Sequence, residues 1–69
     1  MKSSETKLTP RQYDILYHSA YGLSGQEIAD KLGISLNTVK GHRKLMMERL
    51  EVNRISQAVA IAMQRGLLP

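Results

Sequence analysis

The chain has 69 residues and a formal net charge of +4, and it contains no cysteine, phenylalanine or tryptophan. A chain of this length buries only about 60% of the surface that its unfolded form exposes, which leaves room for one small core. Without cysteine there is no disulfide framework, and His18 and His42 alone do not make a metal site. No apolar run approaches the roughly 20 residues that cross a bilayer. We therefore expect one cytoplasmic domain with no metal ion and no membrane partner.

The positive charge is concentrated in one part of the chain. Residues 34–54 carry five basic and two acidic side chains, a net charge of +3, whereas the charges of residues 1–33 cancel. A segment with this excess is typical of a surface that meets a polyanion, although a solvated basic face is the commoner explanation of such a charge pattern.

Capping residues predict the first two helices. Thr9 precedes a proline and is followed three residues later by Gln12, which is typical of a capping box with proline at the first helical position. This pattern predicts a helix over residues 10–21. Ser24 opens a second capping box, and the glycine at position 33 ends a short helix over residues 25–32.

The second half of the chain predicts a long helix and a shorter one. Ser35 is a third capping residue, and the helix that follows, residues 36–50, has no breaker except Gly41. After a polar break in which Asn53 is the expected cap, residues 54–65 form the fourth helix. No stretch shows strand periodicity, so the predicted fold class is all-α.

The predicted domain covers residues 8–69, preceded by a polar tail over residues 1–7. Within the domain, two short helices joined by a tight glycine turn form a helix-turn-helix unit, in the stretch "QEIADKLGISLNTVKGHR". Together with "LTPR" at the start and "TVKGHRKLMMERL" further on, this stretch resembles the LuxR/FixJ-type (GerE-like) DNA-binding domain of bacterial transcription regulators. The resemblance extends over residues 8–68.

The resemblance implies that the third helix enters the major groove of DNA, where the family's base-reading positions match Lys40, Gly41 and Lys44. At about 100° per residue, Gly41 and Lys44 lie opposite the apolar side of this helix, and Lys40 lies at one edge. Glycine departs from the bulkier residue often seen at this position, so contact with a thymine methyl is lost there. Lysine also lacks the two-pronged geometry of arginine, so we expect modest sequence discrimination.

Phosphate contacts are expected from the starts of the second and third helices and from the basic rim, because helix N-termini attract phosphate. The candidates are Ser24, Ser35, Asn37, Thr38, His42, Arg43, Arg49 and Arg54. A structural, hydrogen-bonded role is an equal alternative for His42, and Arg43 has the alternative of laying its stem on the apolar surface.

The fourth helix is apolar on more than one side. One stripe, containing Ala58 and Ala62, can close the core, and a second stripe is formed by Ile55, Val59 and Met63. If exposed, the second stripe is a dimer interface, which would pair two recognition helices on an inverted repeat. The alternative is that so small a domain wraps both stripes into its own core.

The predicted function is a sequence-specific regulator that binds double-stranded DNA as a homodimer, without catalysis, cofactor or small-molecule ligand. Three questions stay open: whether the domain stands alone or is the effector part of a larger regulator, whether it contacts RNA polymerase, and whether it activates or represses. The main alternative is a protein-interaction module that modulates a larger regulator. A sigma-factor type of promoter-binding domain shares the core, but the fourth helix fits the LuxR pattern better.

Overall fold

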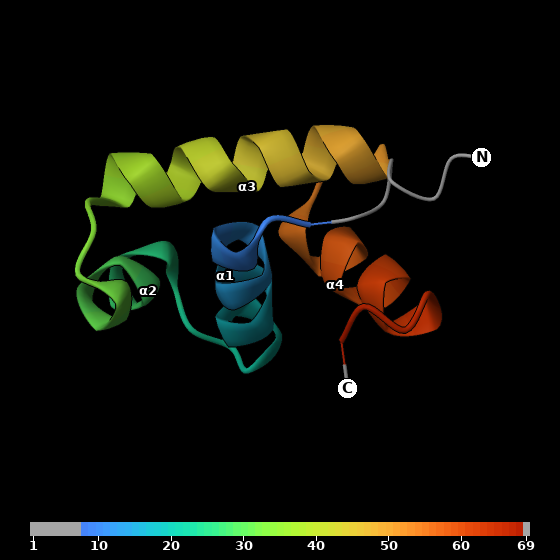
Figure 1. The fold of residues 1–69 in the computed structure, drawn as a ribbon, viewed down its shortest axis with the longest axis horizontal. Helices are drawn as coiled ribbons and strands as arrows, with labels where there is room; N and C mark the ends of the chain where they lie inside the picture. Colours follow the sequence, from blue (N-terminus) through green and yellow to red (C-terminus); the bar gives the residue numbers. More distant parts are fainter. Residues whose placement is uncertain (1–7, 69) are drawn as a thin grey trace.

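The computed structural model of the protein describes residues 8–68, which form four helices and no strand (Figure 1). This confirms the predicted all-α fold. The predicted first helix is one residue too long at its end, and the predicted fourth helix is one residue too long at both ends. The predicted tail, residues 1–7, lies outside the described residues. The helices are α1 (Pro10–Ala20), α2 (Gly25–Leu32), α3 (Leu36–Leu50) and α4 (Ile55–Gln64).

The predicted capping box at the start of α1 is present. The Gln12 backbone N–H donates to the Thr9 hydroxyl oxygen over 3.1 Å, and the Thr9 N–H donates to the Gln12 side-chain oxygen over 3.1 Å. Gln12 is only 4% exposed, so the second bond also gives its buried side-chain oxygen a partner. The cap therefore fixes where the chain enters the first helix.

A tight turn at Gly33 sets α3 against α2. Gly33 has a φ of 70°, a left-handed conformation that glycine adopts without steric cost, and the Ile34 N–H donates to the Ala29 carbonyl oxygen over 3.0 Å. Ser35 then caps α3 by accepting a hydrogen bond from the Thr38 N–H over 3.0 Å. The predicted helix-turn-helix unit is therefore formed as expected.

The connection between α3 and α4 differs from the prediction at the cap of α4. Helix α3 ends at Leu50 as predicted, and Glu51 after it takes the left-handed conformation, with a φ of 59°. Asn53 does not cap α4, because the N-cap residue is Arg54. The Gln57 side-chain oxygen accepts hydrogen bonds from the backbone N–H groups of Asn53, over 3.0 Å, and Arg54, over 3.2 Å. The start of α4 is therefore capped by a side chain from within the helix.

The core lies where α1 meets the other three helices. In Figure 1, α1 stands between α2 and α4, and the long α3 lies across all of them. The largest fully buried side chains come from α1, α2 and α3, and they are Ile15, Leu16, Ile28, Val39 and Met46. Ala58 and Ala62 are fully buried on α4, where their small side chains allow a close approach to the core. The opposite side of α3 is left free of core contacts.

Candidate nucleic-acid interface

The outer face of α3 carries the three predicted base-reading residues. Val39, Met46 and Leu50 face the core, and Lys40, Gly41 and Lys44 are all exposed. Among the described residues, neither lysine has a salt bridge. The structure therefore brings the three together on one solvent-facing surface, built on a helix that α1 and α2 hold rigidly.

Ser24 and Ser35, two of the predicted phosphate-contacting residues, stand at the starts of α2 and α3. Each serine hydroxyl already has a hydrogen-bond partner within its own helix. The Ser24 hydroxyl accepts the Glu27 N–H over 3.1 Å, and the Glu27 carboxylate accepts the Ser24 N–H over 2.8 Å. The Ser35 and Thr38 hydroxyl oxygens lie 2.8 Å apart. Asn37 is exposed beside them. The serines thus act as helix caps, and the Glu27 carboxylate adds a negative charge at the start of α2.

Arg43 lies between three helices. Its side chain is half-buried, and its Nη2 atom donates to the Ser19 hydroxyl of α1 over 3.4 Å. Its Nη1 atom is so close to α2 that a Cβ atom at Gly25 would lie 3.4 Å from it. The guanidinium therefore links α3 to α1 and α2. His42 is likewise half-buried.

The remaining basic candidates lie at the far end of α3. Arg49 and Arg54 are exposed, the first in the last turn of α3 and the second at the start of α4. A helix of 15 residues is about 22 Å long. The serine caps therefore lie at one end of the helix and these arginines at the other.

Leu45 is an apolar side chain on this otherwise polar face, and its exposed fraction is 56%. It borders an open hollow that has the Gly41 backbone at its floor, where an added Cβ would meet nothing within 4 Å. The hollow is lined by Thr38, Gly41, His42, Lys44, Leu45 and Glu48. Sequence reasoning found no role for Leu45. The signal was available, since about 100° per residue places Leu45 about 40° from Gly41 around the helix.

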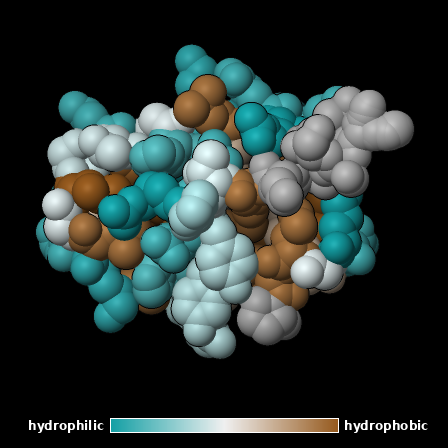
Figure 2. All heavy atoms as spheres, in the orientation of Figure 1, coloured by the Kyte–Doolittle hydropathy of each residue, from teal (hydrophilic) through white to brown (hydrophobic). Residues whose placement is uncertain are grey.

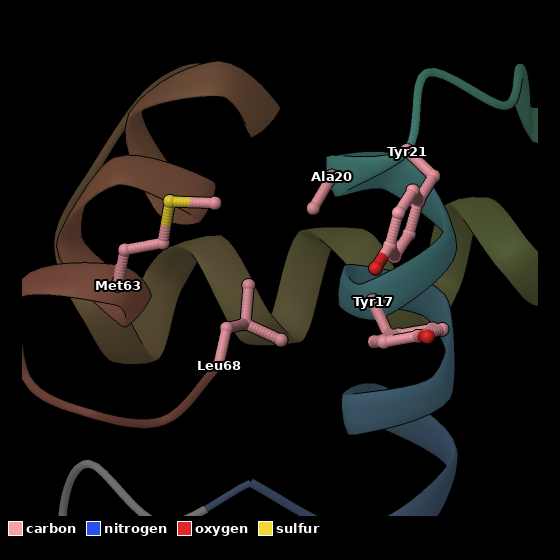
Figure 3. A pocket seen from close by; sticks show the side chains of 5 residues that line it. All are labelled: Tyr17, Ala20, Tyr21, Met63 and Leu68. Carbon is pink, nitrogen blue, oxygen red and sulfur yellow. The ribbon is translucent and has the colours of Figure 1, made fainter.

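A second, quite different surface lies between α1 and the end of the chain. Figure 2 shows hydrophobic atoms between α1 and α4, and Figure 3 shows the side chains that line a groove there. Its volume is about 170 Å³, and its lining residues are Tyr17, Ala20, Tyr21, Met63 and Leu68.

The tyrosines of α1 form a ladder along this surface. The ring centroids of Tyr13 and Tyr17 lie 6.1 Å apart, and those of Tyr17 and Tyr21 lie 4.9 Å apart. A hydrogen bond with Tyr21 raises the pKa of the Tyr17 hydroxyl above its ordinary value of 10.0. The hydroxyl is therefore neutral at physiological pH, which suits an uncharged surface.

The structure divides the predicted dimer stripe. Ile55 and Val59 are half-buried and pack against the core, whereas Met63 is 51% exposed at the mouth of the groove. The side chains of Met63 and Leu68 point across the groove toward α1 (Figure 3). Part of the stripe is thus used within the domain, and the exposed apolar surface is completed by tyrosines that the sequence analysis had left out.

Comparison with known proteins identifies the family. Residues 6–62 match the family described as "Bacterial regulatory proteins, luxR family", which is most of the chain. The chain belongs to the luxR family. The matched region contains the whole of α3 and its base-reading candidates, and it ends one residue before Met63.

Several curated luxR-type regulators are similar to the chain. It is 40% identical over 65 residues to the transcriptional regulatory protein YdfI of Bacillus subtilis, covering 94% of this chain and 30% of that protein. It is 40% identical over 60 residues to the nitrate/nitrite response regulator protein NarP of Escherichia coli, covering 86% of this chain and 28% of NarP. It is 43% identical over 61 residues to the response regulator protein VraR of Staphylococcus aureus, covering 88% and 29%. The chain thus spans less than a third of the length of these relatives.

Within residues 8–68 of this luxR-family chain, none of the helices combines the length and the apolar character of a membrane span. The same residues contain no group of three or more histidine, aspartate or glutamate side chains arranged to hold a metal ion.

Proposed function

We propose that this luxR-family domain regulates transcription by binding double-stranded DNA in a sequence-dependent way, with α3 in the major groove. One observation carries the proposal: Lys40, Gly41 and Lys44 share the exposed face of a helix whose other face is anchored in the core. An α-helix fits the width of the major groove, and a rigidly held helix presents its side chains to base edges in a fixed register.

The proposed division of labour follows the geometry of α3. Lys40 and Lys44 donate to guanine O6 or N7, and Gly41 lets the helix backbone come close to the base pairs. Phosphates are held by the starts of α2 and α3 and by the exposed arginines at the far end of the helix. Arg43 serves mainly as a link between helices, since its guanidinium is already committed to Ser19.

Two domains are proposed to bind together on an inverted repeat. The groove around Met63 supplies an apolar surface on the far side of α1 from the start of α3, where it does not compete with DNA (Figure 1). Joining two domains turns the second binding event into an intramolecular one, which raises the overall affinity without any new DNA contact. Half-sites about one helical turn apart would match such a pair.

The domain is also proposed to act as one part of a larger bacterial regulator in the cytoplasm. The relatives NarP and VraR are named response regulators, and each is more than three times as long as the matched segment. Residues 8–69 would then be the DNA-binding unit, and its role is binding without catalysis.

The alternative of a protein-interaction module is favoured by one observation, the tyrosine-lined groove. Such a module would bind its partner there and leave α3 unused. The two functions therefore assign the binding to different faces of the same domain.

Selection from a random duplex library separates the two functions. The 69-residue chain is immobilised, bound duplexes are amplified and sequenced, and the winner is titrated beside a scrambled duplex at two salt concentrations. The proposal predicts an enriched inverted repeat that is bound at least tenfold more tightly than the scrambled duplex, because each matched base pair contributes about 1 kcal/mol or more. Equal affinity for both duplexes, or no binding, would contradict it.

A further inference from the structure

Leu45 is the one large apolar side chain that is exposed on α3. Single exposed leucines are common on protein surfaces and carry no meaning by themselves. The position of this one is what matters, because it stands beside the hollow over Gly41, between residues proposed to contact DNA. Its exposure of 56% also shows that the core does not need it.

The hollow has a mixed chemical lining. Gly41 leaves its floor bare, Lys44 supplies a positive charge, Glu48 supplies a negative one, and Leu45 supplies an apolar wall. Leu45 lies one helical turn beyond Gly41, about 6 Å along the axis, so its side chain borders the space that a larger residue at position 41 would fill. The free volume therefore lies directly against an apolar group.

This lining fits a base edge better than a phosphate. A phosphate would gain from Lys44, but it would be repelled by Glu48 and would lose part of its own hydration against the apolar Leu45 side chain. The edges of base pairs in the major groove combine hydrogen-bonding atoms with one apolar group, the 5-methyl of thymine. That methyl is the only part of the groove floor for which a leucine side chain is a suitable partner.

We propose that Leu45 is a specificity-determining residue that recognises the 5-methyl group of a thymine. This methyl group enters the hollow over Gly41 and contacts the Leu45 side chain. The apolar contact that glycine cannot make is thereby supplied from the next turn of the same helix. The inference rests on the proposed DNA-binding function and adds a base preference to it: a thymine beside the bases that the lysines read.

The test removes one methyl group at a time. In the selected duplex each thymine is replaced in turn by deoxyuridine, which keeps every hydrogen bond and lacks only the 5-methyl group. Dissociation constants are measured for the unmodified chain and for Leu45→Ala. Alanine favours the helix and the site is exposed, so this variant keeps the fold, as its circular dichroism and melting temperature will show. Gln64→Ala is the control, since it shortens an exposed side chain of α4 that lines neither the hollow nor the groove.

The proposal predicts that one thymine in each half-site is sensitive. Replacing it should weaken binding of the unmodified chain and of Gln64→Ala by about fourfold, the effect of burying one methyl group. The same replacement should leave the affinity of Leu45→Ala unchanged. If every thymine tolerates the replacement, or if Leu45→Ala keeps the same fourfold sensitivity, the inference is wrong while specific DNA binding stands. If no duplex is bound at all, the proposed function and this inference both fail.

Discussion

The outer face of α3 and the groove between α1 and α4 differ in almost every property that matters for binding. The α3 face is polar and basic, with Leu45 as its only large exposed hydrophobic residue. The groove has no charged residue in its lining, and tyrosine, methionine and leucine side chains form its walls. Charged faces suit polyanions and depend on salt, whereas apolar grooves suit other protein surfaces and depend on salt much less. This difference supports the proposal that DNA binds at the α3 face and a protein partner at the groove.

The two surfaces also differ in how they are held. Helix α3 buries Val39, Met46 and Leu50 in the core on one side and exposes the α3 face on the other. Substitutions on the exposed face therefore leave the fold intact. The groove is formed partly by residues that also contact the core, so changes there risk the fold itself. A substitution on the α3 face therefore tests DNA binding alone, whereas one in the groove can also change the stability.

Val59 and Met63 both belong to the predicted dimer stripe, but replacing each by aspartate should affect the stability of the domain very differently. Val59 is half-buried against the core, so Val59→Asp places a charge in apolar surroundings and should lower the stability by about 2 kcal/mol, which for a domain of this size is a melting temperature lower by about 10 °C. Met63→Asp changes an exposed residue and should alter the stability by less than about 0.5 kcal/mol.

The effect of Met63→Asp should appear in assembly instead. Sedimentation with the selected inverted repeat should show one domain bound where the unmodified chain binds two. If two Met63→Asp domains bind the repeat with unchanged affinity, the groove is not the dimer interface.

Replacing Lys44 by alanine should weaken binding to the selected duplex by about tenfold, which is 1.4 kcal/mol, because one base contact is lost. Binding to a scrambled duplex should fall much less. Arg65→Ala is the charge-matched control, since Arg65 is an exposed residue at the end of α4, away from α3. An equal loss on both duplexes, measured by fluorescence anisotropy, would show that Lys44 contacts the backbone and not a base.

Gly41→Ala should make the free domain more stable by about 1 kcal/mol, the difference in helix propensity between the two residues. The added Cβ meets no atom within 4 Å, so nothing opposes the gain. Gly33→Ala is the matched control and should lower the stability, because Gly33 has a positive φ of 70°. Chemical denaturation measures both, and a Gly41→Ala domain less stable than the original would show that the hollow is not open in solution.

Arg54→Ala should have the smallest effect, a loss of affinity of only a few fold that is equal for selected and scrambled duplexes. Its main signature is the salt dependence, whose logarithmic slope should fall by about one for each phosphate contact removed. A slope that does not change would take Arg54 out of the DNA contact.

Much of the fold could be predicted because its signals are local. Ser24 and Ser35 cap the helices that follow them, and Gly33 makes the turn that its position suggests. The features that were not predicted here are also local, but no residue type marks them in the sequence. Glu51 adopts a positive φ at a helix end where no glycine marked it, and Gln57 caps α4 from within the helix.

The candidate site shows the same division. The faces of α3 follow from helical periodicity, so the exposure of Lys40 and Lys44 was predictable. The bond from Arg43 to Ser19 was not predictable, because it joins residues that are 24 positions apart in the chain. The tyrosine ladder was not predictable either, because the part of α1 that stays exposed depends on how the other helices pack against it.

The most direct test of the account is to map the DNA-binding face by nuclear magnetic resonance. The uniformly ¹⁵N-labelled chain is titrated with the selected duplex and, separately, with its scrambled version, and the amide shift changes are followed residue by residue. The account predicts that the largest changes with the selected duplex fall on residues 37–45, on the outer face of α3, and are much smaller with the scrambled duplex. Largest changes at Tyr17, Tyr21 and Met63, with α3 unaffected, would contradict it.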